Sequence, residues 1–68
     1  MGRDEIINVL RANEGRWVSI TLDDGSVHSV TVDAVDEEGV LHSGPDGVNS
    51  RTFWTRFESI VYVELRQR

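Results

Sequence analysis

This chain of 68 residues has no cysteine, no lysine and a single proline, and it has no long apolar run. Without cysteine, neither disulfides nor thiolate metal sites can supplement its core. No segment approaches the roughly 18 apolar residues of a membrane span, and no charged-then-apolar leader precedes a cleavage site. The sequence therefore predicts a soluble protein that is not exported, and a reducing cytoplasm is the expected location.

The shortness of the chain limits its hydrophobic core. A domain of this size buries only about 60% of the surface that its unfolded chain exposes. The balance of burial against chain entropy comes out near zero at such lengths. We therefore expect either a very well-packed fold or self-association that removes more apolar surface.

Charge is unevenly distributed along the chain, whose net charge is −5. Residues 1–50 hold ten acids against three arginines, a net −7, whereas residues 51–68 hold two acids against four arginines, a net +2. An acidic chain opposes non-specific binding to nucleic acid, because that affinity comes from neutralising phosphates. Only a local contact through the C-terminal arginines is compatible with this distribution.

Most of the chain alternates between apolar and polar residues with a period of two, broken by acidic turns that contain glycine. This pattern is typical of half-buried antiparallel strands. The turns are Asp23–Gly25, in which glycine takes a positive φ, then Asp36–Gly39, then Gly44–Gly47 with its proline. The predicted strands cover about 16–22, 26–35, 40–43, 48–56 and 60–65.

An amphipathic helix is predicted for residues 4–14. Asp4 can cap its first turn, and Gly15 can end it in the left-handed conformation. Eleven residues are too few for a stable isolated helix, so its apolar stripe has to dock on the sheet. One helix followed by five short strands predicts a single all-β domain, residues 1–68, in which a strongly bent antiparallel sheet closes into a small barrel.

Two stretches of the sequence resemble the Sm-like family. Residues 21–41, TLDDGSVHSVTVDAVDEEGVL, are similar to the first Sm motif, and residues 52–65, TFWTRFESIVYVEL, are similar to the short second motif. The same outline occurs in the C-terminal domain of bacterial ribosome maturation factors. The resemblance implies a small barrel of the Src-homology-3 type. It also implies homo-oligomeric rings in which the fourth strand of one subunit pairs with the fifth strand of the next.

The departures from the Sm pattern concern the RNA pocket. The family's bend glycine is Val30 here, and the base-contacting Asn would fall at Gly39 or Val40. Neither the Arg-Gly nor the Tyr-Lys-His of the second motif is present, and residues 55–57 (TRF) stand in their place. The resemblance therefore implies the fold more than it implies an RNA-binding site.

No residue pattern indicates catalysis, a metal site or a cofactor. With residues 36–39 as a turn, Asp33 would lie opposite His42, and a His–carboxylate pair can orient a general base or contribute to a metal site. We interpret the pair as an exposed cross-strand contact instead. His28 is expected in solvent, and the serines lack the surroundings of a nucleophile.

The aromatic residues indicate a contact surface. If Phe53 and Phe57 face inward, alternation turns Trp54 and Arg56 outward, and Trp17 opposes the inward Val18. Two outward tryptophans are more aromatic surface than a small monomer usually exposes, although the helix could cover Trp17. Stacking platforms for nucleobases normally lie in positive grooves, so a protein interface is favoured.

The sequence thus predicts a non-enzymatic assembly or protein-interaction module that forms homo-oligomers or binds another protein. The predicted interface residues are Trp54, Arg56, Trp17 and Tyr62. The alternative is an Sm-like RNA-binding protein that uses Arg51, Arg56, Arg66 and Arg68.

Overall fold

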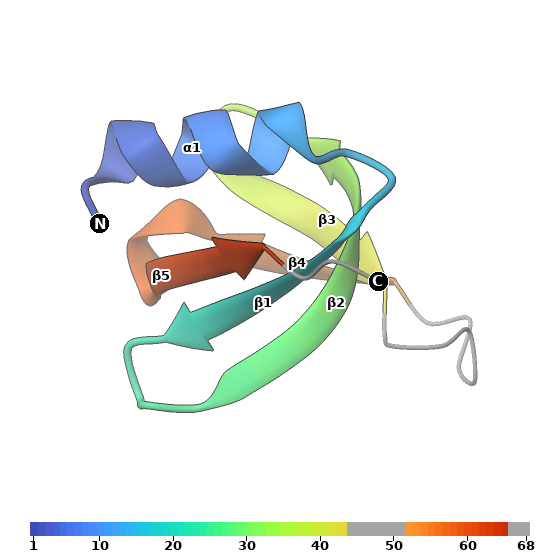
Figure 1. Cartoon of the computed structure of the whole chain (residues 1–68). Coiled ribbons are helices and arrows are strands. Elements are labelled where there is room, and N and C mark those ends of the chain that lie inside the picture. The colour runs from blue at the N-terminus through green and yellow to red at the C-terminus, as the bar shows by residue number, and fades with distance from the viewer. Residues whose placement is uncertain (44–51, 66–68) are drawn as a thin grey trace.

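A computed structural model describes residues 1–43 and 52–65 as one helix packed on a curved five-stranded sheet (Figure 1). The predicted turn at 44–47 and the first half of the predicted fourth strand lie outside the described residues. The other predicted elements agree with the structure to within about two residues. The elements are α1 (Arg3–Ala12), β1 (Trp17–Leu22), β2 (Val27–Val35), β3 (Gly39–Ser43), β4 (Thr52–Arg56), the short 3₁₀ helix η2 (Phe57–Ser59) and β5 (Ile60–Leu65).

The strands form one antiparallel sheet in the order β4-β3-β2-β1-β5. β4 and β5 are consecutive in the chain, linked by η2, yet they stand at opposite edges. Within the described residues no ladder joins them, so the sheet is open. The antiparallel sheet with an N-terminal helix is confirmed, whereas closure into a barrel is not.

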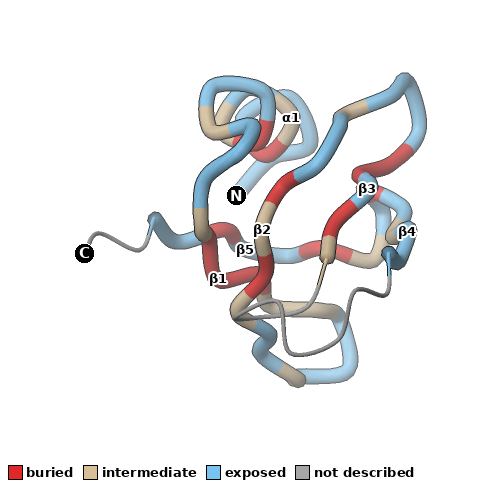
Figure 2. Tube along the Cα trace, turned by 90° about the vertical axis from the view of Figure 1, so that its right-hand side faces the viewer, coloured by how far each residue is buried: buried red, intermediate tan, exposed pale blue. Residues whose placement is uncertain are grey.

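The core lies between α1 and the concave face of the sheet. Ile6 and Leu10 of the helix are buried there, and Figure 2 shows buried segments on β1, β2 and β3 as well. The helix begins after Gly2, which provides no side-chain cap, so the prediction of Asp4 as the capping residue is wrong. The strand and η2 residues of the core are Val18, Ile20, Val30, Val32, Val40, Phe57, Ile60 and Val63.

The turn chemistry agrees with the sequence. Gly15 and Gly25 both have positive φ, +83° and +90°, which a residue with a Cβ rarely adopts. Asp24 accepts hydrogen bonds from the amide and hydroxyl of Ser26, and these bonds hold the pKa of its carboxyl below the ordinary value. Acidic residues followed by glycine therefore turn the chain where the sequence predicts it.

Alternation predicts that Val61, Val63 and Leu65 of the last strand face inward, but only Val63 is buried. Val63 is 3% exposed, but Val61 and Leu65 are 44% and 50% exposed. A register shift between Thr21 and Leu22 skips Val61, whereas Leu65 pairs with Val18 on the same face as Val63. Among the described residues, β5 pairs with β1 alone. Apolar side chains along an edge strand are therefore left in contact with solvent.

Candidate interaction site

The outer edge of β4 carries backbone groups that no neighbouring strand satisfies in the described part of the chain. β4 pairs with β3 alone, with Gly39 opposite Arg56 and Leu41 opposite Trp54. The amide of Phe57 donates to the carbonyl of Glu38 at 3.0 Å, so Glu38 and Phe57, next to the Gly39–Arg56 pair, form a hydrogen-bonded pair of the antiparallel ladder. Because such pairs alternate with non-bonded ones, the N–H and C=O groups of Trp54 and Arg56 point away from β3.

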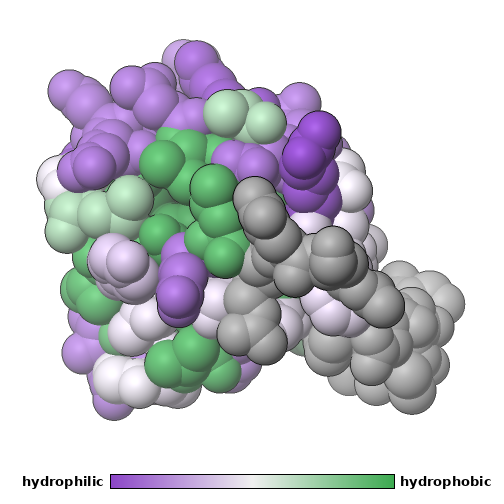
Figure 3. All heavy atoms as spheres, in the orientation of Figure 1, coloured by the Kyte–Doolittle hydropathy of each residue, from purple (hydrophilic) through white to green (hydrophobic). Residues whose placement is uncertain are grey.

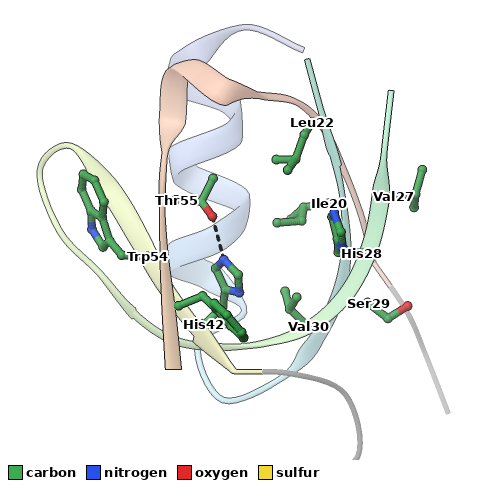
Figure 4. Close-up of a pocket in the computed structure, with 10 residues that line it drawn as sticks. Ile20, Leu22, Val27, His28, Ser29, Val30, His42, Trp54 and Thr55 are labelled. Atoms are coloured by element: carbon green, nitrogen blue, oxygen red, sulfur yellow. Dashed lines mark hydrogen bonds between the residues drawn. The ribbon is translucent and has the colours of Figure 1, made fainter. Parts of the chain in front are cut away.

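The side chains of β4 divide between the two faces of the sheet. Phe53 and Thr55 point to the concave face, and Figure 4 shows Thr55 directed toward His42 with Trp54 on the other side of the strand. Phe53 is 48% exposed and Trp54 is 45% exposed. The prediction of an outward Trp54 is confirmed. The expectation of an inward Phe53 is correct in direction only, because half of its side chain remains in solvent.

Trp54 folds back over the turn between β2 and β3. Its indole N–H donates to Oδ2 of Asp36 at 2.8 Å, and its ring covers Gly39 so closely that a Cβ there would lie 2.6 Å away. The amides of Glu38 and Gly39 donate to Oδ1 of the same aspartate, at 2.8 and 2.7 Å. Led by the Glu38 amide, these donors lower the pKa of the Asp36 carboxyl. They fix the outer face of β4 to the neighbouring turn.

Arg56 is exposed at the end of β4 and lies among acidic side chains. Together with Arg3, Glu37, Glu38 and Glu58, it lines a shallow hollow on the surface. Nearby carboxylates weaken the attraction of an arginine for phosphate. The other predicted RNA-contact residues, Arg51, Arg66 and Arg68, lie outside the described residues.

The predicted interface residues do not form one cluster. Trp54 and Arg56 share the outer face of β4, whereas Tyr62 is 48% exposed on β5 at the opposite edge. Trp17 begins β1 opposite Thr31 and is half-buried. The structure therefore supports a surface centred on β4 and a separate exposed region on β5.

The outer edge of β5 is in contact with the first residue of the chain. The terminal ammonium of Met1 donates to the carbonyl of Val61, and the amide of Val63 donates to Sδ of Met1, each at 3.3 Å. Figure 1 places the N terminus beside β5. Figure 3 shows apolar side chains over the side where β1 and β5 face the viewer, below the hydrophilic surface of the helix.

The predicted arrangement of His42 and Asp33 is wrong. A register shift between Val32 and Ala34 places Val32 opposite His42, and His42 is only 7% exposed. Its Nε2 lies 2.8 Å from Oγ1 of Thr55, while Asp33 accepts a hydrogen bond from the hydroxyl of Ser43 at 2.8 Å. The sequence does not show the β-bulge that causes this shift.

Burial lowers the pKa of His42. The Asp33 carboxylate opposes this effect and the nearby His28 adds to it. Among the described residues, no three His, Asp or Glu side chains gather in a group that could hold a metal ion. His28 is exposed as predicted, and its Nε2 lies 3.1 Å from Oγ of Ser26.

No family model, no curated protein and no solved structure matches this chain. No helix in the described part of the chain is both long and apolar enough to cross a membrane.

Proposed function

We propose that this protein is a non-enzymatic interaction module of the Sm-like kind that binds further copies of itself through the outer edge of β4. The observation that carries the proposal is the outer edge of β4, which pairs with no strand among the described residues. The outward backbone groups of Trp54 and Arg56 lie there beside exposed aromatic rings. An unpaired strand edge is a template for the addition of another strand. The open sheet leaves that template available.

The partner strand in this proposal is β5 of a second copy. β5 is the other terminal strand of the sheet, and its exposed Val61 and Leu65 add apolar surface to a contact. Pairing β4 of one copy with β5 of the next is a head-to-tail contact, which generates a closed ring when the rotation allows it. In such an assembly the sheet continues from copy to copy instead of closing within one chain.

Energetic reasons favour a second copy over a solitary chain. The core of ten buried apolar residues in the described part is small, and the sequence contains no cysteine for a disulfide. Self-association buries more apolar area at about 25 cal/mol per Å². Tryptophan and arginine are enriched among the residues that dominate interface energies, and β4 carries both beside its free edge.

Arg56→Pro tests the proposal without removing a hydrogen bond of the sheet. Arg56 has φ −70° and ψ 144°, which proline adopts without strain, and its N–H points away from β3. We expect wild type and the matched Arg56→Ala control to form the same oligomer in light scattering, whereas Arg56→Pro loses at least tenfold in association constant. A wild-type mass of 7.7 kDa at tens of micromolar, or equal masses for all three, would contradict the proposal.

The same variants address RNA binding, which is the alternative function. In a fluorescence-anisotropy titration with uridine-rich and adenine-rich single strands, we expect no saturable binding below the micromolar range at physiological salt, since the net charge is −5. Sub-micromolar binding that Arg56→Ala abolishes would replace self-association as the proposed function.

A further inference from the structure

A cavity of about 480 Å³ lies on the concave face of the sheet, with walls contributed by β1, β2, β3 and β4. Ligand pockets in proteins span roughly 300–1,000 Å³ and are lined mostly by apolar side chains with a few polar groups. Figure 4 shows Ile20, Leu22 and Val30 on one side of this cavity, with His42 and Thr55 opposite them. Its size and lining therefore fall within the range of small-molecule sites.

His42 is a buried polar side chain in the lining of the cavity, and one of its two ring nitrogens has no hydrogen-bond partner among the described residues. Its Nε2 is paired with the hydroxyl of Thr55. Its Nδ1 is buried and has no partner within the described structure. A buried polar atom without a partner costs about 1–3 kcal/mol, and such an atom calls for an explanation. A ligand that bonds to Nδ1 supplies one.

The charge state of His42 restricts the ligand. Burial lowers the pKa of the imidazole from its ordinary value of 6.5, so the ring is neutral at pH 7. At the rim, His28 contacts the hydroxyl of Ser26, which in turn donates to the carboxylate of Asp24. A neutral imidazole and a nearby carboxylate favour an uncharged ligand over an anion.

Phe53 gives the cavity an aromatic side. Its ring lies 6.0 Å from the His42 ring at an interplanar angle of 27°, and it is 48% exposed. Because Nδ1 is closed to solvent, a ligand reaches it when the imidazole or a neighbouring ring turns. The neighbouring ring is that of Phe53, which lies on an edge strand and is half in solvent. A flat ligand can then stack against both rings.

We propose that this cavity binds a small, uncharged aromatic molecule with one hydrogen-bonding group. The ring of the ligand packs on Ile20, Val30 and Phe53, and its polar group bonds to Nδ1 of His42. Trp54 also borders this cavity, although its ring lies on the other side of β4 (Figure 4).

The proposal is tested by titrating the full chain with phenol and with indole and following its amide resonances by NMR. We expect saturable shifts at Ile20, Val30 and His42, with dissociation constants in the high micromolar to millimolar range. Benzene, which lacks a polar group, should bind several-fold more weakly, in line with the loss of about one hydrogen bond. Benzoate should bind more weakly than phenol because of its charge.

Two variants separate binding in the cavity from adhesion to exposed apolar side chains. Leu22→Phe adds volume at the cavity wall and should abolish binding, whereas Ala12→Phe at an exposed position of α1 is the matched control and should leave it unchanged. His42→Phe keeps the ring and should remove the preference for phenol over benzene. Shifts that do not saturate, or saturable binding that survives both Leu22→Phe and His42→Phe, would overturn the proposal.

Discussion

The two edges of this sheet differ in what lies against them. At the β4 edge, the backbone groups of Trp54 and Arg56 face outward with no strand beside them in the described structure. At the β5 edge, Met1 contacts the outward carbonyl of Val61 and the outward amide of Val63. Since both edges belong to one open sheet, the difference indicates that strand addition at β4 meets less competition than addition at β5.

The side chains at the two edges differ as well. The outer face of β4 is fixed by Trp54, which is held by Asp36 and packed on Gly39. β5 exposes the aliphatic side chains of Val61 and Leu65 instead. A rigid aromatic ring loses little conformational entropy on binding, so we infer that β4 supplies the specific part of a contact and β5 adds apolar area.

The largest expected effect comes from Gly39→Val, which removes the support of the β4 edge. A Cβ at residue 39 would lie 2.5 Å from the Thr55 carbonyl oxygen and 2.6 Å from the Trp54 ring, so β4 has to move. We expect the free energy of unfolding to fall by about 2–3 kcal/mol or more in urea titrations. Ala34→Val is the matched control, because Ala34 is an exposed residue of β2. Equal stabilities would show that Trp54 does not pack on Gly39.

Trp54→Glu should have the next largest effect, on both stability and association. The substitution uncovers Gly39 and places a second carboxylate beside Asp36, so we expect a thermal midpoint lower by about 4–8 °C and a shift toward monomer. Trp54→Phe keeps a ring over Gly39 and should lie between wild type and Trp54→Glu. A Trp54→Glu variant with wild-type mass and midpoint would mean that the β4 edge works without its tryptophan.

A pH titration separates the inner side of β4, where Thr55 contacts His42, from its outer edge. The folded-state pKa of His42 lies below its ordinary value of 6.5. Below about pH 6.5, the unfolded chain therefore binds more protons than the folded protein does. The contribution of His42 to stability is fully present above about pH 6.5 and decreases on acidification. We expect a slope of at most about 1.4 kcal/mol per pH unit from this group. His42→Gln should flatten the profile between pH 7 and 5. A wild-type profile as flat as that of His42→Gln would contradict the buried, neutral imidazole.

The smallest expected effect concerns the β5 edge. A chain that starts at Gly2 lacks both Met1 contacts and exposes the outward groups of Val61 and Val63. If β5 is the partner strand of β4, the shortened chain should self-associate a few-fold more strongly than the full chain in sedimentation equilibrium. An unchanged constant would indicate that β5 takes no part and that two β4 edges pair with each other.

Local patterns in the sequence were sufficient for the elements of the fold. Acidic turns with Gly25, the two-residue period of the strands and the amphipathic helix each depend on near neighbours. Closure of the sheet does not depend on near neighbours alone, because it is set by how far the strands bend. The inward orientation of Val61 was predicted wrongly because alternation does not reveal the register shift, and Leu65 is exposed because β5 lies at an edge of the described sheet.

The candidate sites were less accessible from sequence. The outward orientation of Trp54 follows from alternation, but its contacts with Asp36 and Gly39 require the register of β3 and β4. The available signal was Gly39, which starts β3 and lies two positions before Leu41, the partner of Trp54. The burial of His42 depends on the bulge between Val32 and Ala34, for which the sequence contains no glycine or proline marker.

Amide hydrogen exchange, measured at two protein concentrations, tests most directly whether the outer edge of β4 pairs with a second copy. By the alternation of the ladder, the amides of Trp54 and Arg56 point outward, whereas that of Thr55 is bonded to β3. Our account predicts that raising the concentration from below to above the association range slows exchange at Trp54 and Arg56 at least tenfold, with little change at Thr55. Exchange at Trp54 and Arg56 that stays fast and independent of concentration would contradict it.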